Sequence, residues 1–501
     1  MTRPLQGAVI AGRESRIHGR PRRCRLGLLL WVSAFLCLHA GWLSATTRAQ
    51  ERPRVVVLTD FYKDPDDKQS LIRFLCMANE FDVEGLIATS LAYGDGAVHP
   101  EWIREVLGDY AKVLPSLRRH EREGYAYPSA ESLERVVKAG APVVRRWVGQ
   151  NKGFPVPYPA ATRDARSCDP AENWIGRGKD TAASEHLIAV VDRDDPRPVW
   201  VVVWGGAMDL AQALWKVHEE RTPAQAGRFV QKLRVYQVSW QDTGAVWIWN
   251  HVPDLFLIHN SAALGGNYGE GPADLRDEAW VNANVRQGHG PLGADYPRAG
   301  IPGIKEGDTP SFLYLLATGL SDPEHPDWGG WGGRFRKLEP ARNFYVEAAD
   351  NHPASSDATR RCRWTVGRWN AATSNDFAAR MDWCVRGFAQ ANHHPVVLLD
   401  GDASCQVLHR EVIAGQTLTL DASGTSDPDG DRLHYRWWDY VEAGSYGREL
   451  ALPHADSIAI RLVAPAVEKR ENLHLILEVT DDGQPPLTSY RRVIVAVRPA
   501  P

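Results

Sequence analysis

Short runs of β-branched and apolar residues recur along the first two thirds of the chain, and turns and helical patterns separate them. The run at 55–58 precedes a segment, 68–80, in which apolar residues return every three or four positions, and a second run follows at 83–88. Three similar runs come later, at 199–203, 233–239 and 255–259. Continuous apolar runs indicate strands buried on both faces, and their alternation with helices indicates βαβ units. We therefore expect an α/β domain with an open, mostly parallel sheet.

Helical periodicity and capping residues predict further helices between these strands. They are expected at 100–114, at 129–148 with Ser129 as N-cap, at 181–192 with Thr181 as N-cap, and at 364–388. The segment 149–174 is rich in proline, glycine and polar residues, which predicts a loop. The last helix is expected to close the first domain.

The pattern changes after Pro395. Short alternating strands are expected near 417–420, 433–438, 458–462, 473–479 and 490–497, with turn clusters between them. About 100 residues of this spacing predict an all-β immunoglobulin- or cadherin-like sandwich. Asp427, Asp429 and Asp431 alternate as calcium ligands do, but the same letters are first of all a turn sequence.

The N-terminus has the pattern of a secretory signal. Four arginines between 20 and 25 precede an apolar run at 26–38, and small residues follow near 44–49. We expect residues 1–49 to be removed and the protein to be exported, to the periplasm or the cell exterior. A retained membrane anchor is the alternative.

Composition excludes some classes of function. The net charge is −4, and the mature part has no basic run suited to nucleic acid. Nineteen tryptophans offer stacking surfaces for sugars, although tryptophan is also ordinary core material. The five cysteines outside the signal are too scattered for a disulfide framework or a zinc site. Cys362 and Cys384 are a possible pair, with buried free thiols as the alternative.

Four carboxylates follow the first predicted strand. Asp60, Asp64, Asp66 and Asp67 lie within eight residues, at the edge where open α/β sheets bind ligands. A hard divalent cation would relieve the repulsion between them and could activate a water molecule. The alternative is an acidic helix N-terminus, in which Asp66 or Asp67 acts as cap.

Other strand ends carry polar groups that we expect at the same edge. Gly205 and Gly206 form a turn into a helix, where a backbone carbonyl can face the edge. We expect Gln241, Asp242 and Asn250 near a sugar, with solvated or capping roles as the alternative. Asp308 comes before a helix that starts with proline, where it is a metal ligand or an N-cap. The Trp-Gly-Gly repeat at 328–333 is a sugar-stacking platform or a structural loop.

The strand that ends in Asp60, followed by a short loop and the pair Asp66-Asp67, resembles the motif of nucleoside hydrolases. In that family the first aspartate is the base and the pair binds calcium and ribose. The loop in this sequence is two residues longer than is usual there. The base position therefore falls to Asp60 or Asp64; we favour Asp60, because its backbone is fixed by the strand.

The resemblance extends to two later segments. The Gly-Gly turn is similar to a segment of the family in which a backbone carbonyl binds calcium, and Met208 matches that residue. Asp308 matches the aspartate of a His-Asp-Pro motif, but Gly307 stands where the family has its histidine, the leaving-group acid. The resemblance thus implies Ca²⁺ held by Asp60, Asp67, the Met208 carbonyl and Asp308. It also implies that Asp66 binds sugar hydroxyls.

The full set of motifs resembles one exported bacterial subgroup of nucleoside hydrolase-like proteins, described as cellulose-binding, with a C-terminal sandwich. This implies residues 50–395 as a nucleoside hydrolase-like domain and 396–501 as a sandwich without catalytic residues. It also implies a hydrolase of N-glycosidic or related glycosyl bonds. The alternative is a non-catalytic protein that binds carbohydrate, such as a cellulose-like polysaccharide. The expected partners are a carbohydrate or nucleoside-like molecule, with no nucleic acid and no stable membrane anchor. An O-glycosidase with paired carboxylates would have to use the same aspartates.

Overall fold

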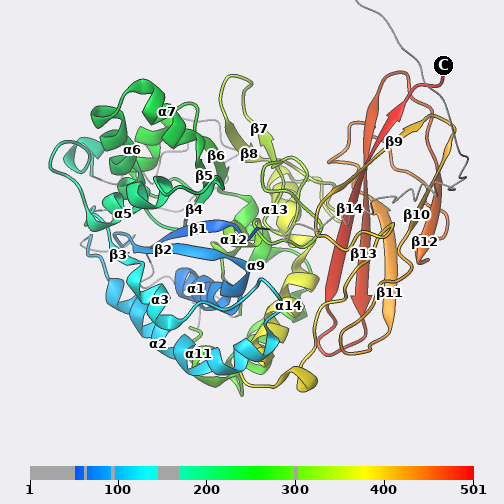
Figure 1. Cartoon of the computed structure of the whole chain (residues 1–501), viewed down its shortest axis with the longest axis horizontal. Coiled ribbons are helices and arrows are strands. Elements are labelled where there is room, and N and C mark those ends of the chain that lie inside the picture. The colour runs from blue at the N-terminus through cyan, green and yellow to red at the C-terminus, as the bar shows by residue number, and fades with distance from the viewer. Residues whose placement is uncertain (1–50, 61–64, 92–95, 145–168, 298–302) are drawn as a thin grey trace, which may run out of the picture. The chain divides into compact units, whose positions relative to one another are not determined.

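The computed structural model describes residues 51–60, 65–91, 96–144, 169–297 and 303–501 (Figure 1). The predicted signal segment, Asp64 and most of the predicted loop 149–174 lie outside these residues. Among the described residues, none of the helices combines the length and the apolar character needed to cross a membrane.

The first part of the described chain is built on an eight-stranded sheet in the order β3-β2-β1-β4-β5-β6-β8-β7. All neighbouring pairs are parallel except β7 with β8. The strands are β1 (Arg54–Thr59), β2 (Asp82–Ala88), β3 (Val137–Ala139), β4 (Val199–Val203), β5 (Leu233–Val238), β6 (Phe256–Asn260), β7 (Phe335–Lys337) and β8 (Phe344–Glu347). The predicted open, mostly parallel sheet is confirmed.

Helices cover both faces of this sheet (Figure 1). Val55 and Val57 of β1 pack in one apolar cluster with α1, α2 and α14, while Val56 and Leu58 pack in a second cluster with α5, α6, α7 and α8. The helices are α1 (Asp66–Cys76), α2 (Pro100–Leu117), α3 (Ala130–Arg135), α5 (Ala182–Val191), α6 (Met208–Glu220), α7 (Pro223–Gln231), α8 (Thr243–His251), α9 (Gly266–Gly269), α10 (Glu278–Val281), α11 (Gly290–Ala294), α12 (Thr309–Leu313), α13 (Ala358–Gly367) and α14 (Asn370–Trp383).

Two predicted helices are corrected. Ser129 caps α3 as expected, through its side chain and the Ser132 N–H, but α3 ends at Arg135. Val137 then pairs with Leu86 as edge strand β3, because this β-branched residue gains ladder bonds and burial at the end of the sheet. The helix predicted at 364–388 is two helices, α13 and α14.

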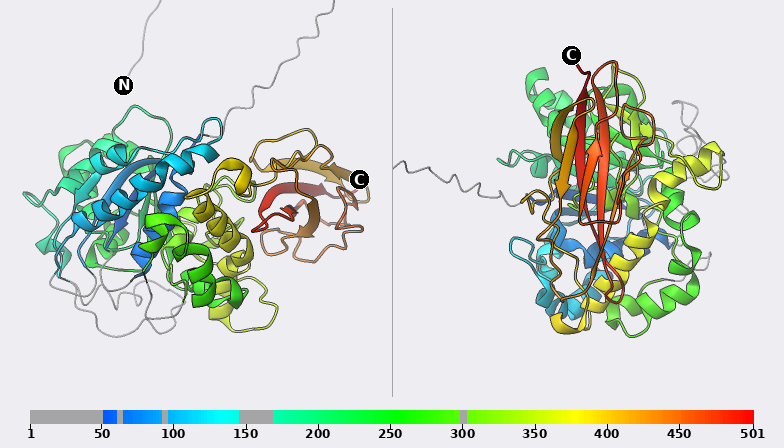
Figure 2. Two further views of the ribbon diagram at one scale, coloured as in Figure 1. Left: turned by 90° about the horizontal axis from the view of Figure 1, so that it is seen from below. Right: turned by 90° about the vertical axis from the view of Figure 1, so that its right-hand side faces the viewer.

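The second part of the described chain is all-β. It has a four-stranded sheet, β11-β13-β14-β9, and a two-stranded sheet, β10-β12, around an apolar core of their own (Figure 2). The strands are β9 (Leu408–Ile413), β10 (Thr417–Asp421), β11 (Leu433–Asp439), β12 (Ala459–Val463), β13 (Glu471–Asp481) and β14 (Thr488–Arg498). The predicted β-rich C-terminal region is confirmed, and β9, parallel to β14, is an additional strand.

The two parts share a buried contact. The Asp350 carboxylate accepts hydrogen bonds from the Tyr440 hydroxyl of the β-region at 2.6 Å, from Arg334 Nε at 2.7 Å and from Arg368 Nη1 at 3.0 Å. Tyr490 of β14 belongs to the same apolar cluster as α1 and α14. One face of the β-region is therefore buried against the α/β part.

The described cysteines are free thiols. Cys362 and Cys384, the possible pair, are not bonded to each other, and Cys384 Sγ lies 3.9 Å from the Sγ of Cys76 in the core. Both residues are free thiols, which was the alternative.

Candidate functional site

Asp67 faces the end of β1. Its Oδ1 accepts a hydrogen bond from the Thr59 hydroxyl at 2.6 Å and another from the Asp60 N–H at 3.0 Å. Pro65 is the N-cap residue of α1, and no described side chain caps this helix, so Asp66 and Asp67 stand inside the first turn. Neither carboxylate is the cap residue, but both lie in the acidic first turn that the alternative expected.

Three carboxylates from two distant segments converge at this edge. Carboxylate oxygens of Asp66, Asp67 and Asp308 lie within 4.8 Å of one another. Asp67 and Asp308 are buried, and Asp66 is half-buried. Oxygen ligands of this kind and spacing fit a hard divalent cation such as Ca²⁺. The donor set is thus suited to the cation that the sequence predicted.

A buried network positions the loop before Asp308. The fully buried Glu306 carboxylate accepts from Arg73 Nη1 at 2.8 Å, from the Tyr296 hydroxyl at 2.6 Å and from the Thr309 hydroxyl at 3.0 Å. Arg73 belongs to α1, so the helix that carries Asp66 and Asp67 also anchors the segment that carries Asp308. This ties the carboxylates together through a rigid element.

The Gly-Gly turn after β4 is required by the close approach of two aspartates. A Cβ on Gly205 would lie 2.4 Å from Asp60 Oδ1, and a Cβ on Gly206 would lie 2.3 Å from Asp242 Oδ2. Because β1, β4 and β5 are neighbours, these side chains meet at one edge, one on each side of the turn. No larger residue fits here without displacing a carboxylate.

The predicted sugar-binding residues differ in their surroundings. Gln241 is half-buried and donates to the Trp204 carbonyl at 3.0 Å. Asp242 is fully buried and caps α8, since its two oxygens accept from the Met208 and Ala245 N–H groups. Asn250 is exposed near the far end of α8, about 12 Å along the helix from Asp242. The structure therefore brings Gln241 and Asp242 to the edge and leaves Asn250 away from it.

The predicted metal ligands are brought together in part. Asp67 and Asp308 belong to the carboxylate cluster, with Asp66 as the third member where we expected Asp60. Asp60 is 7% exposed and adjoins the cluster through its N–H bond to Asp67. Met208 opens α6 and is buried, and its carbonyl stays a predicted ligand. Asp64, the alternative base, lies outside the described residues.

Tyr268 is a site residue that the sequence did not indicate. Its Cε1 lies 4.0 Å from where a Cβ on Gly307 would be, so the ring borders the space that this glycine leaves open. Burial raises the pKa of the Tyr268 phenol, and the charges of Asp66 and Asp308 add to the effect. The residue lies in a glycine-rich segment without periodicity, so only the folded chain reveals its position.

Asp209, in the first turn of α6, has a structural role. It accepts from the Thr181 hydroxyl at 2.6 Å and from the Ala141 N–H at 3.0 Å. Burial raises the pKa of its carboxyl to about 6. These bonds join the starts of α5 and α6 to the segment after β3.

Trp331 of the Trp-Gly-Gly repeat has a packing role. Trp331 is buried, and its ring meets Tyr490 of β14 nearly edge-on, with 6.2 Å between centroids. Trp328 is half-buried and stacks on His325 at 3.9 Å. Trp331 therefore has a structural role, which was the alternative to sugar stacking.

Comparisons with known proteins agree with this architecture. Residues 54–335 match the family described as "Cellulose-binding Sde182, nucleoside hydrolase-like domain", and residues 417–497 match "Cellulose-binding protein Sde0182, C-terminal domain". No curated protein matches the chain.

Solved structures point to the same family. A nucleoside hydrolase-related hypothetical protein from Saccharophagus degradans, associated with carbohydrate metabolism, is 34% identical, with a TM-score of 0.74 over 89% of this chain and 100% of that one. The effector protein XOO4466 and the type III effector XopQ are both 12% identical over 68% of this chain, with TM-scores of only 0.34 and 0.33. The two matches cover 95% and 96% of the effector chains. The chain therefore belongs to the Sde182 family of nucleoside hydrolase-like proteins, as the sequence predicted.

Proposed function

We propose that the protein hydrolyses a glycosyl bond, N-glycosidic or related, in a carbohydrate or nucleoside-like substrate bound at the acidic sheet edge. The observation that carries the proposal is the convergence of Asp66, Asp67 and Asp308, with oxygens within 4.8 Å of one another, beside Asp60. A site that only capped a helix would not need a carboxylate from the distant segment that carries Asp308.

The roles follow from position. Asp66, Asp67 and Asp308 would hold Ca²⁺, with Asp60 and the Met208 carbonyl as further ligands. When bound, the cation supplies electrostatic stabilisation and a more acidic bound water. Asp60 accepts the proton of the attacking water, because the end of β1 and the Asp67 contact fix its backbone.

Substrate binding and leaving-group protonation fall to other groups. Gln241 and Asp66, both half-buried at this edge, would bind sugar hydroxyls. Gly307 has no side chain to protonate a leaving group. Tyr268 borders the space beside it, and a phenol is protonated at neutral pH. We therefore assign the leaving-group proton to the Tyr268 hydroxyl.

The test is hydrolysis by the purified full chain of a panel of nucleosides and cello-oligosaccharides, with Ca²⁺ or with EDTA. We expect turnover of at least one substrate class with Ca²⁺ and its loss with EDTA. Asp308→Asn should lose the activity, and Asp254→Asn, which changes an exposed aspartate in the loop after α8, should keep it. Activity that is indifferent to EDTA and to Asp308→Asn would contradict the proposal.

A second candidate function is carbohydrate binding without catalysis, as the description of the family suggests. The specific observation in its favour is Gly307, which leaves the usual acid position without a side chain. Sedimentation with insoluble cellulose separates the two functions. A binding protein retains cellulose affinity in Asp60→Asn and hydrolyses none of the panel.

We also propose that the protein is exported, in line with the charged and apolar pattern of residues 1–49. N-terminal sequencing of the protein recovered from the periplasm or the medium tests this. A mature chain beginning near residue 50 is expected, and an intact N-terminus in the cytoplasm would contradict it.

A further inference from the structure

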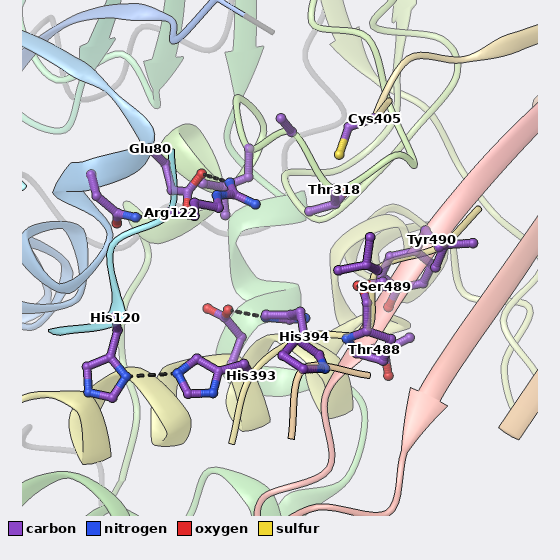
Figure 3. Close-up of a pocket in the computed structure, with 18 of the residues that line it drawn as sticks. Glu80, His120, Arg122, Thr318, His393, His394, Cys405, Thr488, Ser489 and Tyr490 are labelled. Atoms are coloured by element: carbon purple, nitrogen blue, oxygen red, sulfur yellow. Dashed lines mark hydrogen bonds and ion pairs between the residues drawn. The ribbon is translucent and has the colours of Figure 1, made fainter. Parts of the chain in front are cut away.

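A cavity of about 350 Å³ lies where the α/β part meets the β-region (Figure 3). Its walls come from the 3₁₀ turn after α1, from α14, from the 393–397 linker and from the start of β14. The volume falls within the range of roughly 300–1,000 Å³ that is usual for small-ligand pockets. All residues that line it belong to the described chain.

This cavity is separate from the acidic edge. Asp66 and Asp67 stand at the first turn of α1, whereas Glu80, which lines the cavity, follows its other end. An 11-residue helix spans about 16 Å. The cavity and the carboxylate cluster share no residue.

The charged groups of the wall compensate one another. Glu80 accepts from Arg122 Nη2 at 2.6 Å and from Arg380 Nη2 at 3.3 Å. Asp376 lies 3.1 Å from Arg380 Nε and 2.8 Å from His394 Nε2. Glu121, the remaining carboxylate of the wall, accepts from the Tyr127 N–H at 2.7 Å. The three carboxylates are balanced by three arginines of the wall, Arg122, Arg380 and Arg491, so the cavity does not attract a strongly charged ligand. It favours a neutral polar one.

Hydroxyls and aromatic rings supply the remaining lining. Thr318, Ser404 and Thr488 offer hydroxyl groups, and the ring of Phe388, which is 43% exposed, offers flat apolar surface (Figure 3 labels two of these residues). A neutral sugar matches this lining, because its C–H groups pack on aromatic rings and its hydroxyls need hydrogen-bond donors and acceptors.

One buried donor at this cavity lacks an acceptor. Arg491 lines the cavity with a side chain that is 2% exposed, and its Nη1 and Nη2 atoms bind Asp402 at 3.2 Å. Its Nε–H is buried and has no hydrogen-bond partner among the described residues. Buried donors rarely remain unpaired, so we expect the wall beside Arg491 to shift when a water or a ligand hydroxyl binds.

We propose that this cavity is a second carbohydrate site, which binds one or two neutral sugar rings between the α/β part and the β-region. The inference rests on the cavity's own lining and not on hydrolysis at the acidic edge. A ligand held there contacts both parts of the chain, so binding also strengthens the contact between them.

Calorimetric titration of the full chain with neutral disaccharides, cellobiose, xylobiose and mannobiose, tests the proposal in EDTA, which disables a metal-dependent acidic edge. We expect saturable binding of at least one of them in the millimolar range or tighter. Ala317→Trp, which fills the cavity with an indole, should weaken it about tenfold or more. Ala354→Trp, at an exposed position outside the cavity, should not.

Other variants keep the test decisive. Ser404→Trp fills the cavity from the β-region and replaces Ala317→Trp if that protein fails to fold by circular dichroism. Asp308→Asn should retain disaccharide binding even where it abolishes hydrolysis, which separates the two sites. Binding that survives in the folded cavity-filling variant, or is lost in Asp308→Asn, overturns the proposal. So does the absence of binding by the unaltered protein.

Discussion

Replacing Asp308 by asparagine should change stability in opposite directions with and without calcium. The substitution keeps the shape of the side chain and removes one negative charge from the cluster. Without a cation, three carboxylates within 4.8 Å repel one another, and with a cation the same carboxylates bind it. The sign of the effect therefore reports whether this cluster is a metal site.

The magnitude follows from the spacing. Two unit charges 4.8 Å apart, the upper limit of the oxygen separations here, repel by about 3.5 kcal/mol at an effective dielectric constant of about 20. Asp308→Asn removes this repulsion from Asp67 in full and from the half-buried Asp66 in smaller part, because solvent screens it. With Ca²⁺ at a hundredfold its dissociation constant, the unaltered protein gains about 2.7 kcal/mol, which the variant forfeits.

Melting curves in EDTA and in Ca²⁺ measure both effects on one sample. We expect Asp308→Asn to melt higher than the unaltered protein in EDTA and to respond little to Ca²⁺. Asp254→Asn, the control, should behave like the unaltered protein under both conditions. A variant that responds to Ca²⁺ as strongly as the unaltered protein, or a protein that does not respond at all, would refute the metal assignment.

Four other outcomes are expected. If hydrolysis is found, Asp60→Asn should lower turnover by roughly 10² or more and Asp64→Asn by less; the reverse order would make Asp64 the base. Tyr268→Phe should lower turnover while leaving the Ca²⁺-dependent rise in melting temperature intact, and unchanged turnover would remove it as the acid. His259 is fully buried and has no hydrogen-bond partner in the described part of the chain, and burial lowers its pKa from 6.5 to about 3. As the pH falls from 6.5 to 3, the unfolded chain binds a proton that the folded chain does not, so the free energy of unfolding should decrease by a few kcal/mol. His259→Leu should flatten this dependence of stability on pH, which urea titrations at each pH measure. Residues 396–501, expressed alone, should give a β-type circular dichroism spectrum because they contain their own core; a helical spectrum would disagree.

Local elements of the fold were predictable where the pattern was strong. The β-branched run at 55–58 became β1, and the run at 199–203 became β4 with the same bounds. Thr181 caps α5 through a capping box, as its position before an apolar helix indicated. The prediction failed at 129–148, where Val137 found a place in the sheet that local periodicity does not reveal.

The sequence was enough to predict which aspartates lie at the candidate site. An aspartate directly after a parallel strand is expected at the carboxyl edge, and Asp60 and Asp67 are found there. The partners of those residues were harder to infer. Asp242 looked like a sugar ligand and is a buried helix cap, and Asn250 lies at the far end of its helix.

The sequence by itself determined the two kinds of architecture, the acidic loop and the family, because these depend on local periodicity and on motifs along the chain. The strand order was decided only by the tertiary structure. Placing β4 beside β1 brings Gly205 against Asp60, and the Arg73–Glu306 contact brings the Asp308 segment onto α1. Such contacts join residues far apart in sequence, and their free energy comes from packing and buried hydrogen bonds that exist only once the sheet is assembled.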